Sequence, residues 1–177
     1  MIVVIMGVTG SGKTTVGTLL AQQLGWEFAD ADDYHSAANK EKMHKGIPLD
    51  DADRAPWLAS LRQAIEQWIA KGESVVLACS ALKNSYRTEL SVGSDVKFVY
   101  LQGSFELIRQ RLQQRHGHFA SDSILAGQFA DLEEPDDAVI VEIDQSVEAI
   151  VAEIRQKLGL NPAAGDHTDP DHGGAAS

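Results

Sequence analysis

Short apolar runs alternate with longer amphipathic segments along most of the chain. The apolar runs carry few or no polar residues, which is typical of parallel strands covered on both faces. Glycine, proline or short polar stretches separate many of these runs from the segments that follow. We therefore predict five strands, at residues 2–6, 26–29, 75–79, 96–101 and 139–143.

Between the predicted strands, apolar residues recur at the three- and four-residue spacing of amphipathic helices. In the segment 54–71, Trp57, Leu61 and Ile65 share one face, and we expect its tryptophans in the core. Asp53 lies near the start of this helix, and Pro56 is tolerated in its first turn. The other predicted helices lie at about residues 14–24, 39–45, 104–115, 121–134 and 146–158.

Strands that alternate with helices predict an α/β fold with a parallel, right-handed, doubly wound sheet. We expect three layers, with five strands between helices on both faces and a ligand crevice at the carboxyl ends of the strands. The length of 177 residues suits one domain, predicted at residues 1–160. Residues 161–177 contain no large apolar side chain and are expected to form a disordered tail.

Residues 7–14, Gly-Val-Thr-Gly-Ser-Gly-Lys-Thr, match the phosphate-binding pattern G-x-x-x-x-G-K-S/T. The first strand precedes them and a helical pattern follows, which is the context that this P-loop motif requires. Glycines allow the backbone amides to turn inward around a phosphate, and the helix N-terminus adds a partial positive charge. We predict that Lys13 contacts the β- and γ-phosphates and Thr14 contacts Mg²⁺. The other predicted contacts in this loop are Gly7, Gly10, Ser11 and Gly12.

The chain is acidic, with a formal net charge of −11 and a pI of about 4.8. Such a surface repels nucleic acid and anionic membranes, so we expect neither as a partner. A single cysteine, Cys79, excludes an intrachain disulfide and is typical of a reduced compartment, so we expect the cytoplasm. The apolar runs are too short to span a membrane.

A phosphate loop does not say where the phosphoryl group goes. The strand at 75–79 ends without a carboxylate, whereas Asp30 and Asp32 follow the strand at 26–29. In an extended segment, two residues at i and i+2 point the same way, so both acids could face the γ-phosphate. One would hold Mg²⁺ through water and the other would orient or deprotonate an acceptor hydroxyl. An acidic turn without catalytic function is the alternative.

Basic residues form three separate points in this acidic chain. A guanidinium group can bind a carboxylate or phosphate with two hydrogen bonds, although each residue alone could simply be a surface ion-pair partner. Residues 111–118 precede a glycine-containing break, as a mobile lid would, and we place this lid at about residues 111–125. The three points are Arg54, then Lys83 with Arg87, and Arg111 with Arg115.

The chain resembles the gluconate kinases (gluconokinases) from the first predicted strand to about Leu158, and two blocks of residues carry the resemblance. The first block contains Asp32-Asp33-Tyr34-His35, Asn39, Lys42-Met43, Gly46, Pro48-Leu49, Asp51, Asp53-Arg54 and Pro56-Trp57-Leu58. The second contains Cys79-Ser80-Ala81-Leu82-Lys83, Tyr86-Arg87, His118-Phe119, Gln128-Phe129, Leu132-Glu133 and Pro135.

This resemblance implies ATP-dependent phosphorylation of D-gluconate at its terminal hydroxyl, which gives 6-phosphogluconate. It also implies a fold similar to shikimate and nucleoside monophosphate kinases, and often a homodimer. Residue by residue, it implies a nucleotide contact from Thr15, an acceptor-facing Asp32, and an Asp30 nearer to Mg²⁺. The remaining implied roles are gluconate binding by His35, Arg54, Lys83 and Arg87, and catalytic lid contacts by Arg111 and Arg115.

Two alternatives remain open at this point. Another small-molecule kinase of the same fold, for shikimate or a nucleotide, would differ mainly in the block from Tyr34 to Leu58. A nucleotide-dependent switch of the GTPase type would need an Asn-Lys-x-Asp motif. The segment Asn39-Lys40-Glu41-Lys42 lacks the aspartate and lies too early in the chain.

Overall fold

A parallel sheet forms the centre of the computed structural model, which describes residues 1–115 and 122–160. The strand order is β2-β3-β1-β4-β5, and every neighbouring pair is parallel. The predicted α/β fold class with a five-stranded parallel sheet is therefore confirmed. The strands are β1 (Ile2–Met6), β2 (Glu27–Asp30), β3 (Val75–Ala78), β4 (Val96–Gln102) and β5 (Val139–Glu142).

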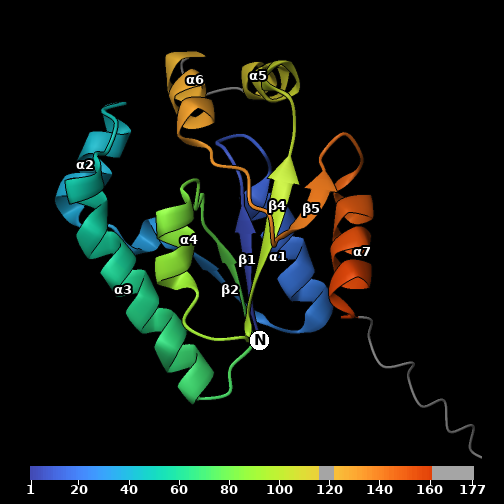
Figure 1. Ribbon diagram of the computed structural model, residues 1–177. Coiled ribbons are helices and arrows are strands. Elements are labelled where there is room, and N and C mark those ends of the chain that lie inside the picture. The colour runs from blue at the N-terminus through green and yellow to red at the C-terminus, as the bar shows by residue number, and fades with distance from the viewer. Residues whose placement is uncertain (116–121, 161–177) are drawn as a thin grey trace, which may run out of the picture.

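Helices cover both faces of this sheet. Figure 1 shows α1 and α7 on one side and α3 and α4 on the other, with α5 and α6 beyond the carboxyl ends of the strands. No helix in the described ranges is both long and apolar enough to cross a membrane. The helices are α1 (Lys13–Leu24), η1 (Ala31–Tyr34, a 3₁₀ turn), α2 (Ala37–His44), α3 (Asp51–Ala70), α4 (Asn84–Leu90), α5 (Phe105–Gln114), α6 (Asp122–Asp131) and α7 (Val147–Leu158).

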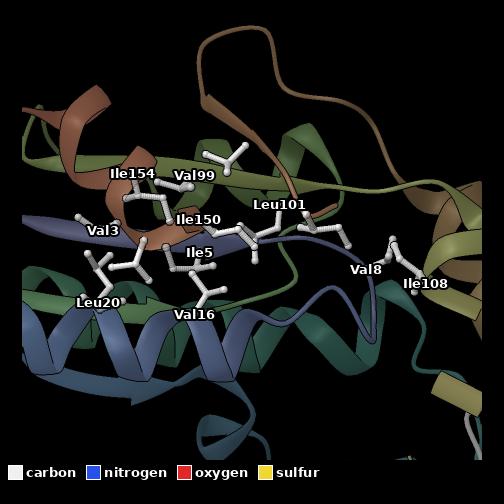
Figure 2. Close-up of a cluster of buried hydrophobic side chains, with 14 of the residues drawn as sticks. Val3, Ile5, Val8, Val16, Leu20, Val99, Leu101, Ile108, Ile150 and Ile154 are labelled. Atoms are coloured by element: carbon white, nitrogen blue, oxygen red, sulfur yellow. The ribbon is translucent and has the colours of Figure 1, made fainter. Parts of the chain in front are cut away.

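Alternate residues of β1 enter two different hydrophobic clusters. Val3 and Ile5 pack with residues of α1 and α7, whereas the even-numbered residues of β1 pack with α3 and α4. The first cluster reaches the phosphate loop, because Val8 lies beside Ile108 of α5 (Figure 2). The loop is thereby part of the packed core.

The register of the strands brings three loops to one edge. Ile5 of β1 pairs with Ala78 of β3, and Ala78 pairs with Asp30 of β2. The strands therefore end level with one another, and the segments that follow them lie side by side. One further bond joins two of these segments, since the amide of Gly7 donates to the carbonyl of Ser80 at 3.3 Å.

The predicted helix at 54–71 begins three residues earlier in the structure, at Asp51. A capping box explains this start: the Asp50 carboxylate accepts the amide of Asp53, and the Asp53 carboxylate accepts the amide of Asp50. The earlier start places Arg54 in the first turn of α3, beside the edge of the sheet where the loops meet.

The short helix predicted near residues 39–45 is confirmed as α2, whose N-cap is Ser36. In contrast, α4 was missed by the sequence analysis. It has only seven residues, and its apolar positions are too few to show a helical period. The centre of the predicted lid, at 116–121, and the predicted tail, at 161–177, lie outside the described residues.

Trp57 connects η1 to the hydrophobic cluster that contains residues of α3 and α4. Its indole nitrogen donates to the carbonyl of Ala31 at 2.7 Å, and its ring stacks on His35 with centroids 4.4 Å apart. Trp57 is only 5% exposed, so the prediction that it belongs to the core is confirmed. The indole thus holds the backbone that carries Asp32.

Replacing Trp57 by Phe removes the indole hydrogen bond that the buried carbonyl of Ala31 accepts. We expect Trp57→Phe to lower the free energy of unfolding by about 1–3 kcal/mol more than Trp68→Phe does. Trp68 is a matched control on the same helix, because it is half-buried and its indole donates no hydrogen bond among the described residues. Urea-induced unfolding measures both losses, and equal losses would contradict this role for the indole.

Candidate active site

The phosphate loop presents a row of backbone amides that the protein leaves available. Within residues 1–115 and 122–160, the amides of Gly10 and of residues 12–15 donate to no protein acceptor. No side chain caps α1 at Gly12, which adopts a left-handed conformation. Unpaired amides at a helix N-terminus form a site for an anion.

Gly10 shows why this loop requires glycine. Its φ is +76°, and a Cβ atom there would lie 2.8 Å from the side chain of Leu112 on α5. Ser11 is also enclosed, with 1% of its surface exposed and no partner for its hydroxyl among the described residues. The hydroxyl-bearing residues Thr14 and Thr15, at the start of α1, are exposed.

Lys13 folds back over the loop. Its Nζ donates to the carbonyls of Gly7 at 3.0 Å and Val8 at 2.9 Å. Burial lowers the pKa of Lys13, while the nearby carboxylates of Asp32 and Asp30 act in the opposite direction. The lysine and the two acids therefore belong to one electrostatic cluster.

The prediction that Asp30 and Asp32 lie along an extended segment is wrong. Asp30 ends β2, but its carboxylate accepts the amide of Asp32 at 3.0 Å, and this bond turns the chain into η1. Both acids still lie near Lys13. Desolvation and the charge of Asp30 raise the pKa of Asp32, and Lys13 opposes this rise.

Arg54 and Lys83, which are far apart in the sequence, meet around the ring of Tyr86. Their cationic groups lie 5.7 and 5.6 Å from its centre, and Arg54 also donates to its hydroxyl at 3.0 Å. Asp51 completes the cluster by accepting from the Tyr86 hydroxyl at 2.5 Å and from Lys83 at 3.1 Å. These two bonds lower the pKa of Asp51, and the bond to Asp51 raises the pKa of Lys83.

A small pocket opens beside this cluster, between α3, the loop after β3, α4 and the end of α6. It has a cation from one helix and a carboxylate from another, with apolar and hydroxyl groups between them. Such a lining offers a cation, a carboxylate and hydroxyl groups to a small polar ligand. The lining residues are Arg54, Trp57, Ser80, Leu82, Tyr86 and Asp131.

Arg87 is buried against backbone carbonyls, whereas a residue that contacts a ligand was expected at this position. It is 6% exposed, and its guanidinium donates to the carbonyls of Ala81 at 2.6 Å, Leu82 at 3.0 Å and Glu133 at 2.6 Å, and to the side chain of Asn84. Ala81 has a left-handed φ of +45°, which is strained for a residue with a Cβ atom. Arg87 therefore holds the bent loop beside the pocket.

His35 lies behind the pocket instead of lining it. It is 8% exposed and stacked on Trp57, and its Nδ1 lies 3.4 Å from the side-chain nitrogen Nδ2 of Asn39. Burial and the charge of Arg54 lower the pKa of His35. In this structure the histidine supports the residues of the pocket.

The two lid arginines do not share a helical face as predicted. Arg111 lies in α5 and donates to the carbonyl of Ile143 at 2.5 Å, whereas Arg115 is an exposed C-cap residue with extended backbone. The helix ends before Arg115, so the spacing of four residues does not align them. Arg109 joins α5 to α6 instead, through an ion pair with Asp122 at 3.2 Å.

Several residues of the site carry no functional pattern of their own in the sequence. Tyr86 and Asp51 appeared only as parts of the family resemblance, because α4 and the first turn of α3 were not assigned. With α4 in place, Lys83 and Tyr86 are one helical turn apart, and this spacing could have indicated a shared site. No local sequence pattern indicated that Asp131 would line the pocket.

The donors present suit a magnesium ion that is held mainly by substrate phosphates and water. In the described ranges, no group of three or more His, Cys, Asp or Glu residues could hold a metal alone. Magnesium typically retains several waters and binds one or two carboxylates together with substrate phosphates. The Thr14 hydroxyl and the carboxylates of Asp30 and Asp32 offer that kind of site.

The fold and the phosphate loop define a P-loop kinase of the shikimate kinase type, and the sequence profile named "Shikimate kinase" matches residues 9–158. Relatives in other organisms narrow this class. A probable gluconokinase of Xenopus tropicalis is 46% identical over 89% of this chain and 93% of its own. The gluconokinase of Gluconobacter oxydans is 50% identical over 76% of each chain. The chain belongs to the gluconokinase family.

A solved structure agrees with this assignment. The crystal structure of a gluconokinase from Sinorhizobium meliloti superposes with a TM-score of 0.81. Its sequence is 40% identical to this chain, and the match covers 89% of this chain and 90% of the other. The family resemblance noted from the sequence is therefore confirmed.

Proposed function

We propose that this protein transfers the γ-phosphoryl group of ATP to the 6-hydroxyl of D-gluconate and releases 6-phospho-D-gluconate and ADP. The observation that carries the proposal is the placement of the Arg54–Tyr86–Lys83 cluster and its small pocket beside a phosphate loop in a chain of the gluconokinase family. The two parts accept the two reactants of a small-anion kinase.

The nucleotide end would be held by the unpaired amides of Gly10 and residues 12–15, together with Lys13. Lys13 now bonds to two loop carbonyls, and a bound phosphate would offer it a stronger, charged acceptor. Mg²⁺ would be held by Thr14 and, through water, by Asp30, and would neutralise charge that develops on the phosphates.

At the acceptor end, Arg54 and Lys83 would bind the carboxylate of gluconate. In the absence of ligand, Asp51 forms an ion pair with Lys83 and accepts from the Tyr86 hydroxyl, so an incoming carboxylate must compete with an internal one for Lys83. Tyr86 would keep the two cations at a fixed separation, because it bonds to Arg54 and packs against both. Gluconate bound by its acid end would direct its far hydroxyl toward the phosphate loop.

Asp32 would accept the proton of the 6-hydroxyl as it attacks the γ-phosphorus. Its raised pKa makes it a stronger base than an ordinary aspartate. Most of the rate would come from positioning, since phosphoryl transfer asks for little covalent chemistry from the protein.

Other features belong to the same proposal. Arg111 and Arg115 would approach the phosphates from the lid, and residues 1–160 would act as one kinase domain. A homodimer in the cytoplasm fits the resemblance and the cysteine content.

The direct test is ADP release from ATP and Mg²⁺ with a panel of acceptors: gluconate, shikimate and nucleoside monophosphates. We expect rapid release with gluconate alone. The same rate with and without gluconate would indicate an ATPase and contradict the proposal. A preference for shikimate or a nucleotide would assign another substrate to the same fold.

Asp32→Asn should lower kcat by about 100-fold or more, because the amide cannot accept the hydroxyl proton. The affinity for ATP should change little. In the wild type, kcat should fall as acidification protonates Asp32, and the raised pKa shifts this fall to higher pH than for an ordinary aspartate. The variant should lose this acidic limb of the pH profile. Wild-type turnover in the variant would exclude Asp32 from the reaction.

Tyr86→Phe removes a hydroxyl that bonds to both Arg54 and Asp51. We expect KM for gluconate to rise about tenfold, as the loss of one hydrogen bond to a charged group implies, while KM for ATP stays unchanged. Tyr100→Phe is the matched control, because its hydroxyl faces Glu134 and lies outside the pocket lining. Equal kinetic effects in the two variants would contradict the role of Tyr86.

A further inference from the structure

A side chain of α6 bonds directly to the phosphate loop. The Oε1 atom of Gln128 accepts the amide of Thr9 at 2.6 Å, although the two residues are 119 positions apart. Thr9 immediately precedes the amides that are left available for a phosphate. Gln128 thus fixes one end of the anion-binding row.

The same helix also reaches the acceptor pocket. Asp131 lies three residues after Gln128, which places both on one face of α6. Its side chain lines the pocket with Arg54 and Tyr86, and its charge acts on Lys83. One helical turn therefore separates the contact with the nucleotide loop from the contact with the acceptor site.

The chain just after α6 ties this helix to the loop beside the pocket. The amide of Glu133 donates to the carbonyl of Leu82 at 2.8 Å, and the carbonyl of Glu133 accepts from Arg87 at 2.6 Å. The side chain of Glu133 also accepts from the backbone amide of Asn84 at 3.3 Å. Any shift of α6 must therefore act on the pocket wall.

Packing makes α6 and α5 move together. Leu125 is 1% exposed within the cluster that contains Val8 and Ile108. Phe129 packs edge-on against Phe105 of α5, with ring centroids 5.6 Å apart. A packed helix transmits a displacement more readily than a flexible loop does.

We propose that α6 couples the two substrate sites, with Gln128 as the positioning residue through which an occupied acceptor pocket stabilises the phosphate loop. The inference rests on the proposed function for the identity of the acceptor. Gluconate in the pocket restrains Asp131 and the loop after β3, which fixes α6 and the bond from Gln128 to Thr9. Because coupling between binding sites is reciprocal, bound nucleotide also tightens gluconate binding.

The test is a set of calorimetric titrations with a non-hydrolysable ATP analogue, with and without saturating gluconate. In the wild type we expect gluconate to increase the affinity for the analogue about fivefold or more. Gln128→Met keeps the length of the side chain and removes the oxygen that accepts the amide of Thr9. The coupling factor, which is the increase in analogue affinity that gluconate causes, should therefore fall to about one. The affinity for gluconate alone should stay unchanged.

Gln63→Met is the matched control, since Gln63 is exposed on α3 and makes no side-chain hydrogen bond among the described residues. It should retain the wild-type factor. Gln128→Glu keeps an oxygen that can accept the amide of Thr9, and it should retain part of the factor. Equal factors in the wild type and Gln128→Met, including a factor of one in both, would overturn the coupling.

A substrate-free measurement separates this inference from the proposed function. Amide hydrogen exchange at Thr9 should be faster in Gln128→Met than in the wild type, and the Gln128→Glu variant should restore slow exchange. Unchanged exchange in Gln128→Met would overturn the positioning role of Gln128 with no acceptor present. Failure of the wild type to bind gluconate, with or without nucleotide, would instead overturn the proposed acceptor.

Discussion

The level ends of β1, β2 and β3 are the constraint on which the site depends. Because Ile5, Ala78 and Asp30 lie in register, the phosphate loop, the acid turn and the loop after β3 begin at one edge. The bond from Gly7 to Ser80 then holds two of these loops together. The hydrogen bonds of the sheet fix the register of the strands, so the segments that follow them stay side by side.

Charge in this acidic chain is distributed so that its cations are restrained before a ligand arrives. Arg54 and Lys83 both lie over the ring of Tyr86, and Lys83 also bonds to the carboxylate of Asp51. These contacts restrain two half-buried side chains. Burying Arg87 serves a different purpose, because its donors satisfy carbonyls of a strained loop. Arg54 and Lys83 are therefore the cations proposed to meet the ligand, whereas Arg87 holds the loop behind them.

The parts of this molecule that local sequence dictates were predictable, and the parts that depend on distant contacts were not. The strands and the phosphate loop show in short patterns of apolar residues and glycine. The turn at Asp32 was misjudged because a side-chain bond from Asp30 outweighed the extended path. The environment of Arg87 and the partner of Gln128 had no local pattern, because each depends on a residue brought near only by folding.

The phosphate loop has the backbone groups that a nucleotide needs, and contacts from α5 and α6 hold it in shape. Gly10 packs under Leu112 of α5, while Thr9 is held by Gln128 of α6. Both helices lie beyond the carboxyl ends of the strands (Figure 1). Asp131 of α6 lines the pocket together with Arg54 and Tyr86. A kinase must avoid transfer to water, and the proposed coupling through α6 would favour a productive nucleotide complex when the acceptor is present. The same contacts that complete the fold at the end of the sheet thus provide a physical link between the two substrates.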